Sequence, residues 1–318
     1  NQLSGQHTRM INFATLNRAP VLWRSKDEMQ FGIHPTQSIR VAPQTAHNLL
    51  QENLERIESS VTPDLSMIPS PEHLTALHRE GFTSYEIKNI LETKITIFGA
   101  GRMGMTIAVL LAGSGYPAIH IQDATRVKPD DVTTWGASRI DIGARRDNVA
   151  YLLIERMYRG TFASIPRRNL SATKHLAILC PDPVADWPWF PPQMTDQFIA
   201  SDQPHIAVAC GPQNIHISSV IHPGRTACMK CHDAHLVDAD SSWPLISSQL
   251  IGRPMNDQTP NTLLLFSAHF VLQLVHAWTN STNVTESRLW DVRWPSLNTV
   301  HTTMTPHPAC GCGWNQRL

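Results

Sequence analysis

The chain carries little charge, and neither sign dominates. Charged residues make up 16% of its 318 residues, against about 25% in an average globular domain. Its 26 lysines and arginines balance 26 aspartates and glutamates, so the formal net charge is zero. A protein without a net field does not recruit nucleic acid or an acidic membrane surface by bulk electrostatics. We therefore expect no nucleic-acid partner.

Long hydrophobic runs are missing as well. We find no stretch that reaches the ~18–20 apolar residues needed to cross a bilayer. The N-terminal residues NQLSGQHTRMINF lack the apolar run of a secretory signal. These absences predict a cytoplasmic protein without a membrane partner. Hydrophobic residues still make up 42% of the chain, which is enough for a core, and 23 prolines indicate many ordered loops.

Cysteine is scarce, and four of the six cysteines stand in two close pairs, Cys228 with Cys231 and Cys310 with Cys312. This spacing does not match a secreted disulfide framework, and thiols that bind metal in a reducing compartment fit better. Each pair can supply two corners of a thiolate tetrahedron around Zn²⁺. We predict a closed structural zinc site that ties the C-terminal tail to the loop after the fourth predicted strand.

Other uses of the cysteines and their neighbours stay open at this point. A redox C-x-x-C pair would normally open a helix directly after a first strand, which is not where Cys228 lies, and metal-free thiols are a further alternative. His232 and His307 neighbour the pairs and could replace a ligand, although exposed loop positions suit them better. Cys180 and Cys210, at strand ends, are either buried small residues or a thiol that accepts an acyl group.

A glycine motif, Gly99-Ala-Gly101-Arg-Met-Gly104, lies between an apolar β-rich run at 94–98 and an apolar helix at 103–113. A second predicted strand at 118–122 ends at Asp123. Strand, glycine turn, helix, strand and acid form the order of a dinucleotide-fold unit. Glycines allow the backbone to approach phosphates, the helix N-terminus attracts them, and Asp123 can accept both ribose hydroxyls. The alternative is that the fold persists while its pocket is empty or serves another use.

The remaining pattern predicts three parts. Residues 1–18 are polar and flexible, residues 19–91 form a small β/α module, and residues 92–318 form the nucleotide-type domain with its C-terminal metal-binding tail. The small module contains a strand pair and resembles a winged-helix peptide-binding domain. The other predicted elements are helices at 44–58, 71–80, 84–91, 143–158 and 261–278, strands at 175–179 and 205–209, and two strands within 281–303. We expect helix 261–278 to be buried in the core rather than in a dimer interface, because it is apolar nearly all round.

Several motifs together resemble the ThiF/MoeB family, the bacterial relatives of ubiquitin-activating enzymes. They are the glycine motif with Asp123, Cys180-Pro-Asp182 after the third predicted strand, the run QPHIAVACG, and the two cysteine pairs. The resemblance implies a Rossmann-like α/β fold with a mixed sheet. It also implies adenylation of the C-terminus of a peptide or small ubiquitin-like protein with ATP and Mg²⁺, a four-cysteine structural zinc, and a homodimer.

A narrower resemblance rests on the stretch from His222 to Cys231, the run from Asp238 through Trp243, and His307-Pro-Ala-Cys310. These segments look like those of actinobacterial ThiF-like proteins, which are described as leader-peptide-binding partners in thiazole/oxazole-modified peptide pathways. In that group a small N-terminal domain holds the leader peptide of a precursor. The resemblance therefore implies a peptide ligand for residues 19–91 and a partner modifying enzyme.

The chain departs from the family at the positions that contact ATP. Where adenylating members carry an Asn-Leu-x-Arg-Gln-type segment, residues 131–142 read DVTTWGASRIDI, and Arg139 is their only arginine. Arg146 stands in place of a phosphate-binding lysine, and an arginine fork is not equivalent to an ammonium group. Asp182 aligns with the magnesium-binding aspartate. These residues could bind Mg-ATP, with Arg102 or Arg139 assisting Arg146. The alternative is that Asp182 and an arginine form an ion pair without a ligand.

Two functions therefore compete. The chain is either an ATP-dependent adenylyltransferase that activates a carboxylate, or a degenerate scaffold that binds a leader peptide and presents it to a partner enzyme. The missing Asn-Leu-x-Arg-Gln segment favours the scaffold. A nicotinamide-dependent dehydrogenase would share the glycine motif but would not explain the cysteine pairs.

Overall fold

The computed structural model describes residues 21–31, 39–49, 51, 77, 81–157, 174–184, 187–250, 257–280 and 287–312. Predictions on residues 1–18, and most of those on the helices at 44–58 and 71–80, lie outside these ranges. The chain divides into two compact units, Asn1–Lys88 and Asn89–Leu318.

The first unit contains a three-stranded antiparallel sheet in the order β1-β2-β3. Its strands are β1 (Val21–Ser25), β2 (Glu28–Phe31) and β3 (Ile39–Val41). The predicted strand pair is confirmed and forms a hairpin, since Val21 pairs with Phe31 across the turn. Residues 43–49 are helical, and a small core joins the buried Phe31 to the buried Ala46 of this helix. The strand β3 was not predicted, because its three residues are too few to show an alternating pattern.

Helix α4 (Ser84–Leu91) lies where a helix was predicted. Its start is fixed by a capping box: Thr83 Oγ1 accepts a hydrogen bond from the Glu86 N–H, and Glu86 Oε2 accepts one from the Thr83 N–H. These two reciprocal bonds satisfy backbone donors that a helix start otherwise leaves without partners.

The second unit is built on a seven-stranded sheet in the order β10-β9-β8-β7-β6-β4-β5. Four strands are parallel: β4 (Thr93–Phe98), β5 (Ala118–Gln122), β6 (Lys174–Leu179) and β7 (His205–Cys210). Three are antiparallel: β8 (Asn214–Ser218), β9 (Arg288–Arg293) and β10 (Asn298–Thr303). The predicted mixed sheet is confirmed. The strand β8 was missed, because its five residues NIHIS hold only two apolar residues, which are too few to establish an alternation.

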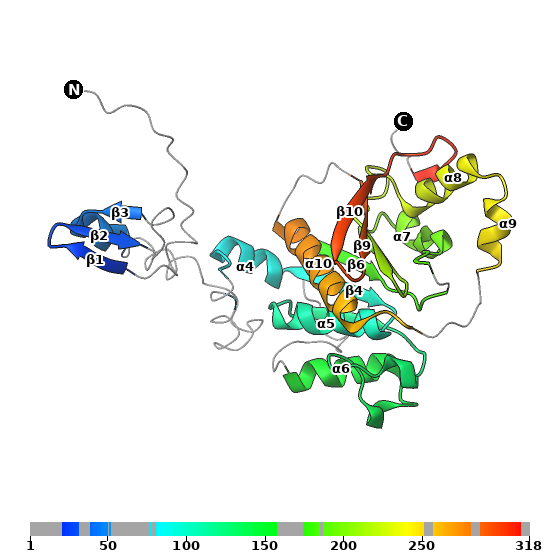
Figure 1. The fold of residues 1–318 in the computed structure, drawn as a ribbon, viewed down its shortest axis with the longest axis horizontal. Helices are drawn as coiled ribbons and strands as arrows, with labels where there is room; N and C mark the ends of the chain where they lie inside the picture. The colour runs from blue at the N-terminus through cyan, green and yellow to red at the C-terminus, as the bar shows by residue number, and fades with distance from the viewer. Residues whose placement is uncertain are drawn as a thin grey trace. The chain divides into compact units, whose positions relative to one another are not determined.

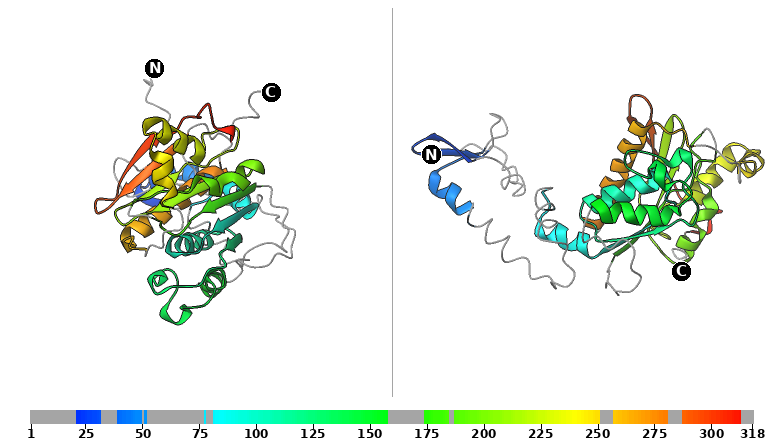
Figure 2. Two further views of the ribbon diagram at one scale, coloured as in Figure 1. Left: turned by 90° about the vertical axis from the view of Figure 1, so that its right-hand side faces the viewer. Right: turned by 90° about the horizontal axis from the view of Figure 1, so that it is seen from below.

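Two groups of helices surround this sheet. Helices α5 (Arg102–Gly113), α6 (Arg146–Met157) and α10 (Asn261–Asn280) pack side by side (Figure 1). Both views of Figure 2 show the same pairing of α5 with α6. Helices α7 (Asp196–Ala200), α8 (Met229–Ala239) and α9 (Trp243–Ser248) form the second group. A second-unit core cluster joins Ala207 and Ala209 of β7 to Met229 of α8 and to the tail residue Met304.

Helix α10 corrects two predictions. Its length and composition would allow it to cross a membrane, so the expectation of no such stretch was wrong. The helix is also not buried all round. Leu263, Val271 and Val275 are fully buried, whereas Phe266 is 38% exposed. Because one face packs against α5 and β8, α10 behaves as a core helix with one solvent-facing side.

Helix α6 begins later than predicted. It starts at Arg146 rather than at residue 143, since Gly143 has a φ of 88° and its carbonyl accepts a hydrogen bond from Arg126 Nη1. Residues 143–145 therefore belong to a turn, and this turn positions Arg146 at the end of the parallel strands.

Candidate functional site

The glycine turn connects β4 to α5 and packs against the end of β6. Gly99 has a φ of 94°, and a Cβ there would lie 2.1 Å from the Cys180 carbonyl oxygen. A Cβ on Gly104 would lie 1.9 Å from the Gly99 carbonyl oxygen. Close packing alone therefore requires these two glycines. Gly101 differs, because its missing Cβ faces Asp182 Oδ1 at 3.0 Å and Arg146 Nη1 at 3.8 Å.

Asp123 closes the turn from the end of β5. Its Oδ2 accepts a hydrogen bond of 2.7 Å from the Ala100 N–H. Its Oδ1 accepts bonds from the Thr125 N–H at 2.9 Å and the Thr125 hydroxyl at 2.6 Å. The side chain is 6% exposed. Since both oxygens already have protein donors, a ribose hydroxyl would have to displace the Thr125 hydroxyl to reach this carboxylate.

Arg146 gathers three carboxylates at the ends of the parallel strands. Its guanidinium binds Asp131 with two hydrogen bonds, from Nε at 2.8 Å and from Nη2 at 2.7 Å. Nη1 donates to Asp182 Oδ1 at 2.8 Å and lies 3.5 Å from Asp123 Oδ2. Arg146 and Asp131 are buried, with side chains 3% and 4% exposed. The predicted residues Arg146, Asp182, Gly101 and Asp123 thus come together in one place.

Lys128 completes this cluster and was not predicted. Its Nζ lies 3.2 Å from Asp182 Oδ2, and its side chain is 56% exposed, against 37% for Asp182. Lys128 precedes the short helix η2 (Pro129–Asp131), where Asp131 Oδ2 accepts the Lys128 N–H at 2.7 Å. The ion pair of Asp131 with Arg146 holds η2 against the end of the parallel strands. Lys128, directly before η2, therefore lies at the solvent-exposed edge of these charged residues. We call Lys128, Asp123, Asp131, Arg146 and Asp182 the charged cluster.

The pKa values follow from this arrangement. Burial alone would lower the pKa of Arg146, but its hydrogen bonds to Asp131 and Asp182 outweigh burial and raise it. Partial burial would raise the pKa of Asp182, but the hydrogen bond and charge of Arg146, together with the charge of Lys128, lower it. Asp182 is therefore an ionised, half-exposed carboxylate at neutral pH, with Oδ1 on Arg146 and Oδ2 on Lys128.

The other two candidate arginines lie elsewhere. Arg139 is exposed in the short helix η3 (Arg139–Asp141), and within the described residues no hydrogen bond or ion pair joins it to the charged cluster. Arg102 is buried at the start of α5, where its guanidinium donates to the carbonyl oxygens of Asp257 and Thr259 and to Asn261 Oδ1. These hydrogen bonds connect α5 to the start of α10, and the guanidinium does not contact the charged cluster.

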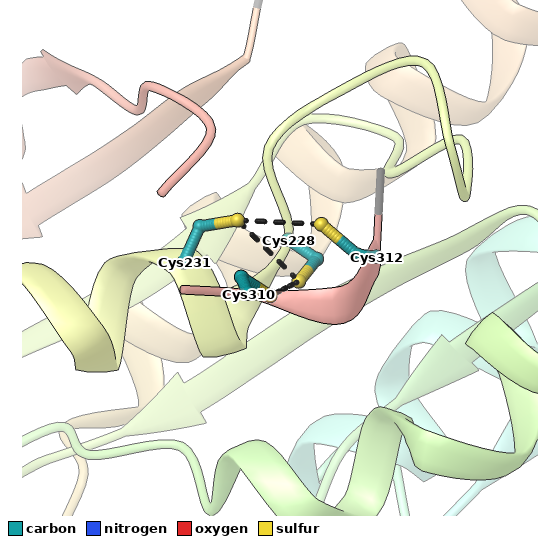
Figure 3. A group of neighbouring side chains, drawn as sticks. All are labelled: Cys228, Cys231, Cys310 and Cys312. Carbon is teal, nitrogen blue, oxygen red and sulfur yellow. Dashed lines mark hydrogen bonds between the residues drawn. The ribbon is translucent and has the colours of Figure 1, made fainter. Parts of the chain in front are cut away.

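The four paired cysteines meet in one cluster (Figure 3). The sulfur atoms of Cys228 and Cys231 are 3.8 Å apart, those of Cys228 and Cys310 are 3.7 Å apart, and those of Cys231 and Cys312 are 3.3 Å apart. A zinc tetrahedron with Zn–S bonds of about 2.3 Å spaces its sulfurs by about 3.8 Å. The donor set and spacing therefore fit Zn²⁺ as a closed structural site that fastens the tail to α8.

The surroundings of the cysteines differ from the prediction in three ways. Cys228 is the N-cap residue of α8, so the first pair opens a helix and does not lie in a loop. His232 lies on α8 and is half-buried, and His307 is 9% exposed, so neither is an exposed loop residue. Gly311 has open space around it, so the tight turn does not need a glycine for steric reasons.

The thiols divide into two kinds. The sulfur atoms of Cys228, Cys231, Cys310 and Cys312 contact one another as one group. Cys180 and Cys210 are buried and outside the cluster, and burial raises the pKa of both. A thiol that stays protonated is a poor nucleophile. Cys180 and Cys210 therefore act as buried small residues, which is the simpler of the two expectations.

A separate small cavity lies between α8 and strands β7 to β9. Its walls are mostly aromatic and apolar and include Trp187, Trp189, Phe190, Met229 and Leu289. Its volume of about 50 Å³ holds a few water molecules or a small side chain. None of its lining residues belongs to the glycine turn or the charged cluster, and it is too small for a nucleotide.

Solved structures share this architecture. No protein-family model and no curated protein sequence matches the chain. E. coli MccB with AMPCPP and selenomethionine MccA is 14% identical, with a TM-score of 0.56, and the match covers 93% of this chain and 98% of MccB. E. coli MccB with ATP is 15% identical, with a TM-score of 0.54 and coverages of 94% and 99%. PaaA is 13% identical, with a TM-score of 0.57 and coverages of 90% and 98%. The chain thus has an MccB-like fold, which confirms the predicted ThiF/MoeB-like fold.

Proposed function

We propose that the chain binds Mg-ATP at the charged cluster and adenylates the carboxylate of a peptide or small ubiquitin-like protein. The observation that carries this proposal is the half-exposed Asp182 carboxylate, which lies between Arg146 and Lys128 and faces Gly101. A carboxylate oxygen is the ligand that Mg²⁺ prefers, and a neighbouring ammonium group suits the phosphates. The fold likeness to MccB, which has been solved with ATP and with MccA, supports the same proposal.

The chemistry needs little from the protein beyond position and charge. The peptide carboxylate is already ionised, and it attacks the α-phosphorus of ATP. A new P–O bond forms to the carboxylate, and the bond to the β-phosphate oxygen breaks, so that acyl-adenylate and pyrophosphate result. Asp182 would hold Mg²⁺, whose charge offsets the departing pyrophosphate. Lys128 would contact phosphate, and Gly101 would let the backbone approach it.

We propose a role for Arg146 that differs from the phosphate contact predicted from the sequence. Its donors are committed to Asp131, Asp123 and Asp182, so it holds Asp182 in place and does not contact phosphate. Lys128 takes the phosphate contact in this proposal.

Pyrophosphate exchange tests the assignment. The intact chain, with ATP, labelled pyrophosphate and a precursor peptide encoded beside its gene, should form labelled ATP. Asp182→Asn should lower this exchange by at least about 10²-fold, because the metal ligand and its charge are lost. Asp130→Asn removes an exposed carboxylate next to the cluster and should leave exchange unchanged. Equal exchange in both variants would rule out Asp182 as the metal ligand.

A leader-peptide scaffold without turnover is the second candidate. Two observations favour it. The charge of Arg146 is balanced by three carboxylates, and the chain lacks the family's Asn-Leu-x-Arg-Gln segment. In this case the peptide binds the first unit, where β1 and β3 are the two edges of the sheet and offer backbone groups to an added strand. Under this proposal the chain belongs to the actinobacterial leader-peptide-binding group. It forms a homodimer and presents the peptide to a partner modifying enzyme. Peptide binding without pyrophosphate exchange would select it.

A further inference from the structure

A second group of metal-ligand side chains lies on the same helix and tail as the four cysteines. His235 and Asp238 are three residues apart on α8, so they share one face of the helix. His307 comes from the tail, just before Cys310. The candidate ligand atoms of these three side chains all lie within 4.8 Å of one another. Neither the proposed adenylation nor the four-cysteine site uses them.

The hydrogen bonds of His307 orient its ring towards the helix. Its Nδ1 accepts a bond of 3.1 Å from the Ala309 N–H, so the ring proton resides on Nε2. Nε2 lies 2.8 Å from Asp238 Oδ2. A metal ion at Nε2 requires the ring proton to move to Nδ1, so the bond from the Ala309 N–H would break, and Asp238 would change from hydrogen-bond acceptor to ligand.

His235 is arranged in a complementary way. Its ring meets the ring of His307 edge to face, with centroids 4.8 Å apart and an interplanar angle of 81°. Its Nε2 lies 3.1 Å from the Thr305 carbonyl oxygen. A ligating histidine commonly donates its other ring N–H to a backbone carbonyl, which fixes its tautomer. With Nε2–H directed to Thr305, Nδ1 of His235 keeps its lone pair for a metal.

We propose that His235, Asp238 and His307 form a second divalent-metal site, which takes Zn²⁺ and is separate from the four-cysteine site. Two imidazoles and one carboxylate are a donor set that suits Zn²⁺, and three protein ligands leave the fourth position to water. His235 and Asp238 are exposed, whereas His307 is nearly buried. The ion is therefore in contact with solvent and exchanges more readily than an ion held by the four thiolates.

This site has a structural consequence. The tail segment from Thr305 to Cys312 would be fastened to α8 at two points, by the cysteines at one end and by His307 at the other. The pair of His307 with the exposed Asp238 alone contributes little to stability, whereas a bound metal ion stabilises the folded state by an amount that grows with the logarithm of its concentration above the dissociation constant. Added Zn²⁺ should then raise the thermal midpoint of protein that already holds zinc in its thiolates.

Zinc titration of the untagged full chain tests the proposal. Calorimetry on protein that already contains one zinc per chain should show one further site per chain. His235→Ala and Asp238→Asn should each abolish the further site and keep the first zinc, which also shows that the variants are folded. His301→Ala, an exposed histidine on β10, is the matched control and should retain both sites.

Cobalt distinguishes the two sites by spectrum. Co²⁺ added to the second site should show no thiolate charge-transfer band, because its ligands are nitrogen and oxygen, and Asp238→Asn should remove the signal. The proposal is overturned if the wild-type chain takes up no metal beyond the first ion, or if the further site persists in both His235→Ala and Asp238→Asn. Neither outcome depends on ATP or on a peptide, so the proposed adenylation is tested separately.

Discussion

Arg146 is the residue on which the charged cluster depends. Its removal would leave Asp131 and Asp123 as buried carboxylates without their counter-charge. Breaking a buried pair from one side costs about 3–5 kcal/mol, so we expect Arg146→Ala to lower the free energy of unfolding by that amount in urea titrations. Arg139→Ala changes an exposed arginine and should stay within about 0.5 kcal/mol. Equal stability of the two variants would contradict the cluster geometry.

The glycines of the turn can be ranked by what a methyl group would meet. In Gly104→Ala the new Cβ would lie 1.9 Å from the Gly99 carbonyl oxygen, so α5 has to move away from the turn. Overpacking of this kind costs about 1–3 kcal/mol, more than the roughly 1 kcal/mol gained in helix propensity. Gly311→Ala meets no atom within 4 Å and should be neutral. Thermal unfolding of both variants gives the comparison.

Local patterns explain why part of the site could be predicted from sequence. Gly99, Gly101 and Asp123 follow directly from a strand, a turn and a second strand that are contiguous in the chain. Lys128 and Asp131 could not be predicted in the same way. Their positions depend on the pairing of Asp131 with Arg146, which is a contact between separate segments and leaves no periodic pattern in either.

Strand β7 contains a histidine that makes stability depend on pH. His205 is fully buried, and its Nδ1–H donates to the Gln203 carbonyl oxygen. Among the described residues, its Nε2 has no hydrogen-bond partner. Burial, together with the charge of the nearby His222 and despite the bond to Gln203, lowers the pKa of His205 to about 4.

The sign of the effect follows from the two states. Between the unfolded pKa of about 6.5 and the folded value of about 4, only the unfolded chain takes up the proton. The contribution of neutral His205 to the free energy of unfolding is therefore fully present above pH 6.5. It falls as the pH drops towards 4, by about 3 kcal/mol in total. Urea unfolding of zinc-loaded protein should show a shallower pH slope in His205→Gln than in wild type. Parallel slopes would exclude His205 as the source.

Helix α8 and the tail depend on the four cysteines. Cys310→Ser should release the tail from α8, because a site with three thiolates no longer closes around Zn²⁺. We expect a fall in the thermal midpoint on the order of 10 °C and faster proteolysis near residues 304–312. Cys180→Ala removes a thiol outside the cluster and should keep one zinc per chain. Full zinc content in Cys310→Ser would contradict the four-cysteine site.

Element prediction succeeded where periodicity was strong and failed where a helix or strand was short or polar. The strands β6 and β7 contain continuous apolar runs, as buried parallel strands usually do. The strands β4 and β5 mix apolar with polar residues, but they flank the glycine turn and its helix, and all four strands were found. Helix α8 was missed because its sequence MKCHDAHLVDA shows almost no apolar periodicity. Its start is set by Cys228 and Cys231, whose packing with the tail is a tertiary constraint.

The likeness to MccB covers 93% of the chain, and within the chain the small first unit has its own sheet and core. If the first unit supplies the peptide contacts, its removal should weaken peptide binding and leave the fold of the second unit intact. A chain that begins at Thr83 keeps the capping box of α4, so we expect it to retain its zinc and its thermal unfolding transition. Its affinity for the precursor peptide should fall at least about tenfold, measured by fluorescence anisotropy.

The same truncation distinguishes the two proposed roles at the scale of the molecule. Pyrophosphate exchange depends on the charged cluster, which lies entirely in the second unit. Exchange at high peptide concentration should therefore survive in the truncated chain if the protein is an adenylating enzyme, with a raised KM for peptide and a nearly unchanged kcat. Undiminished peptide affinity would instead place recognition in the second unit, and the first unit would then need another explanation.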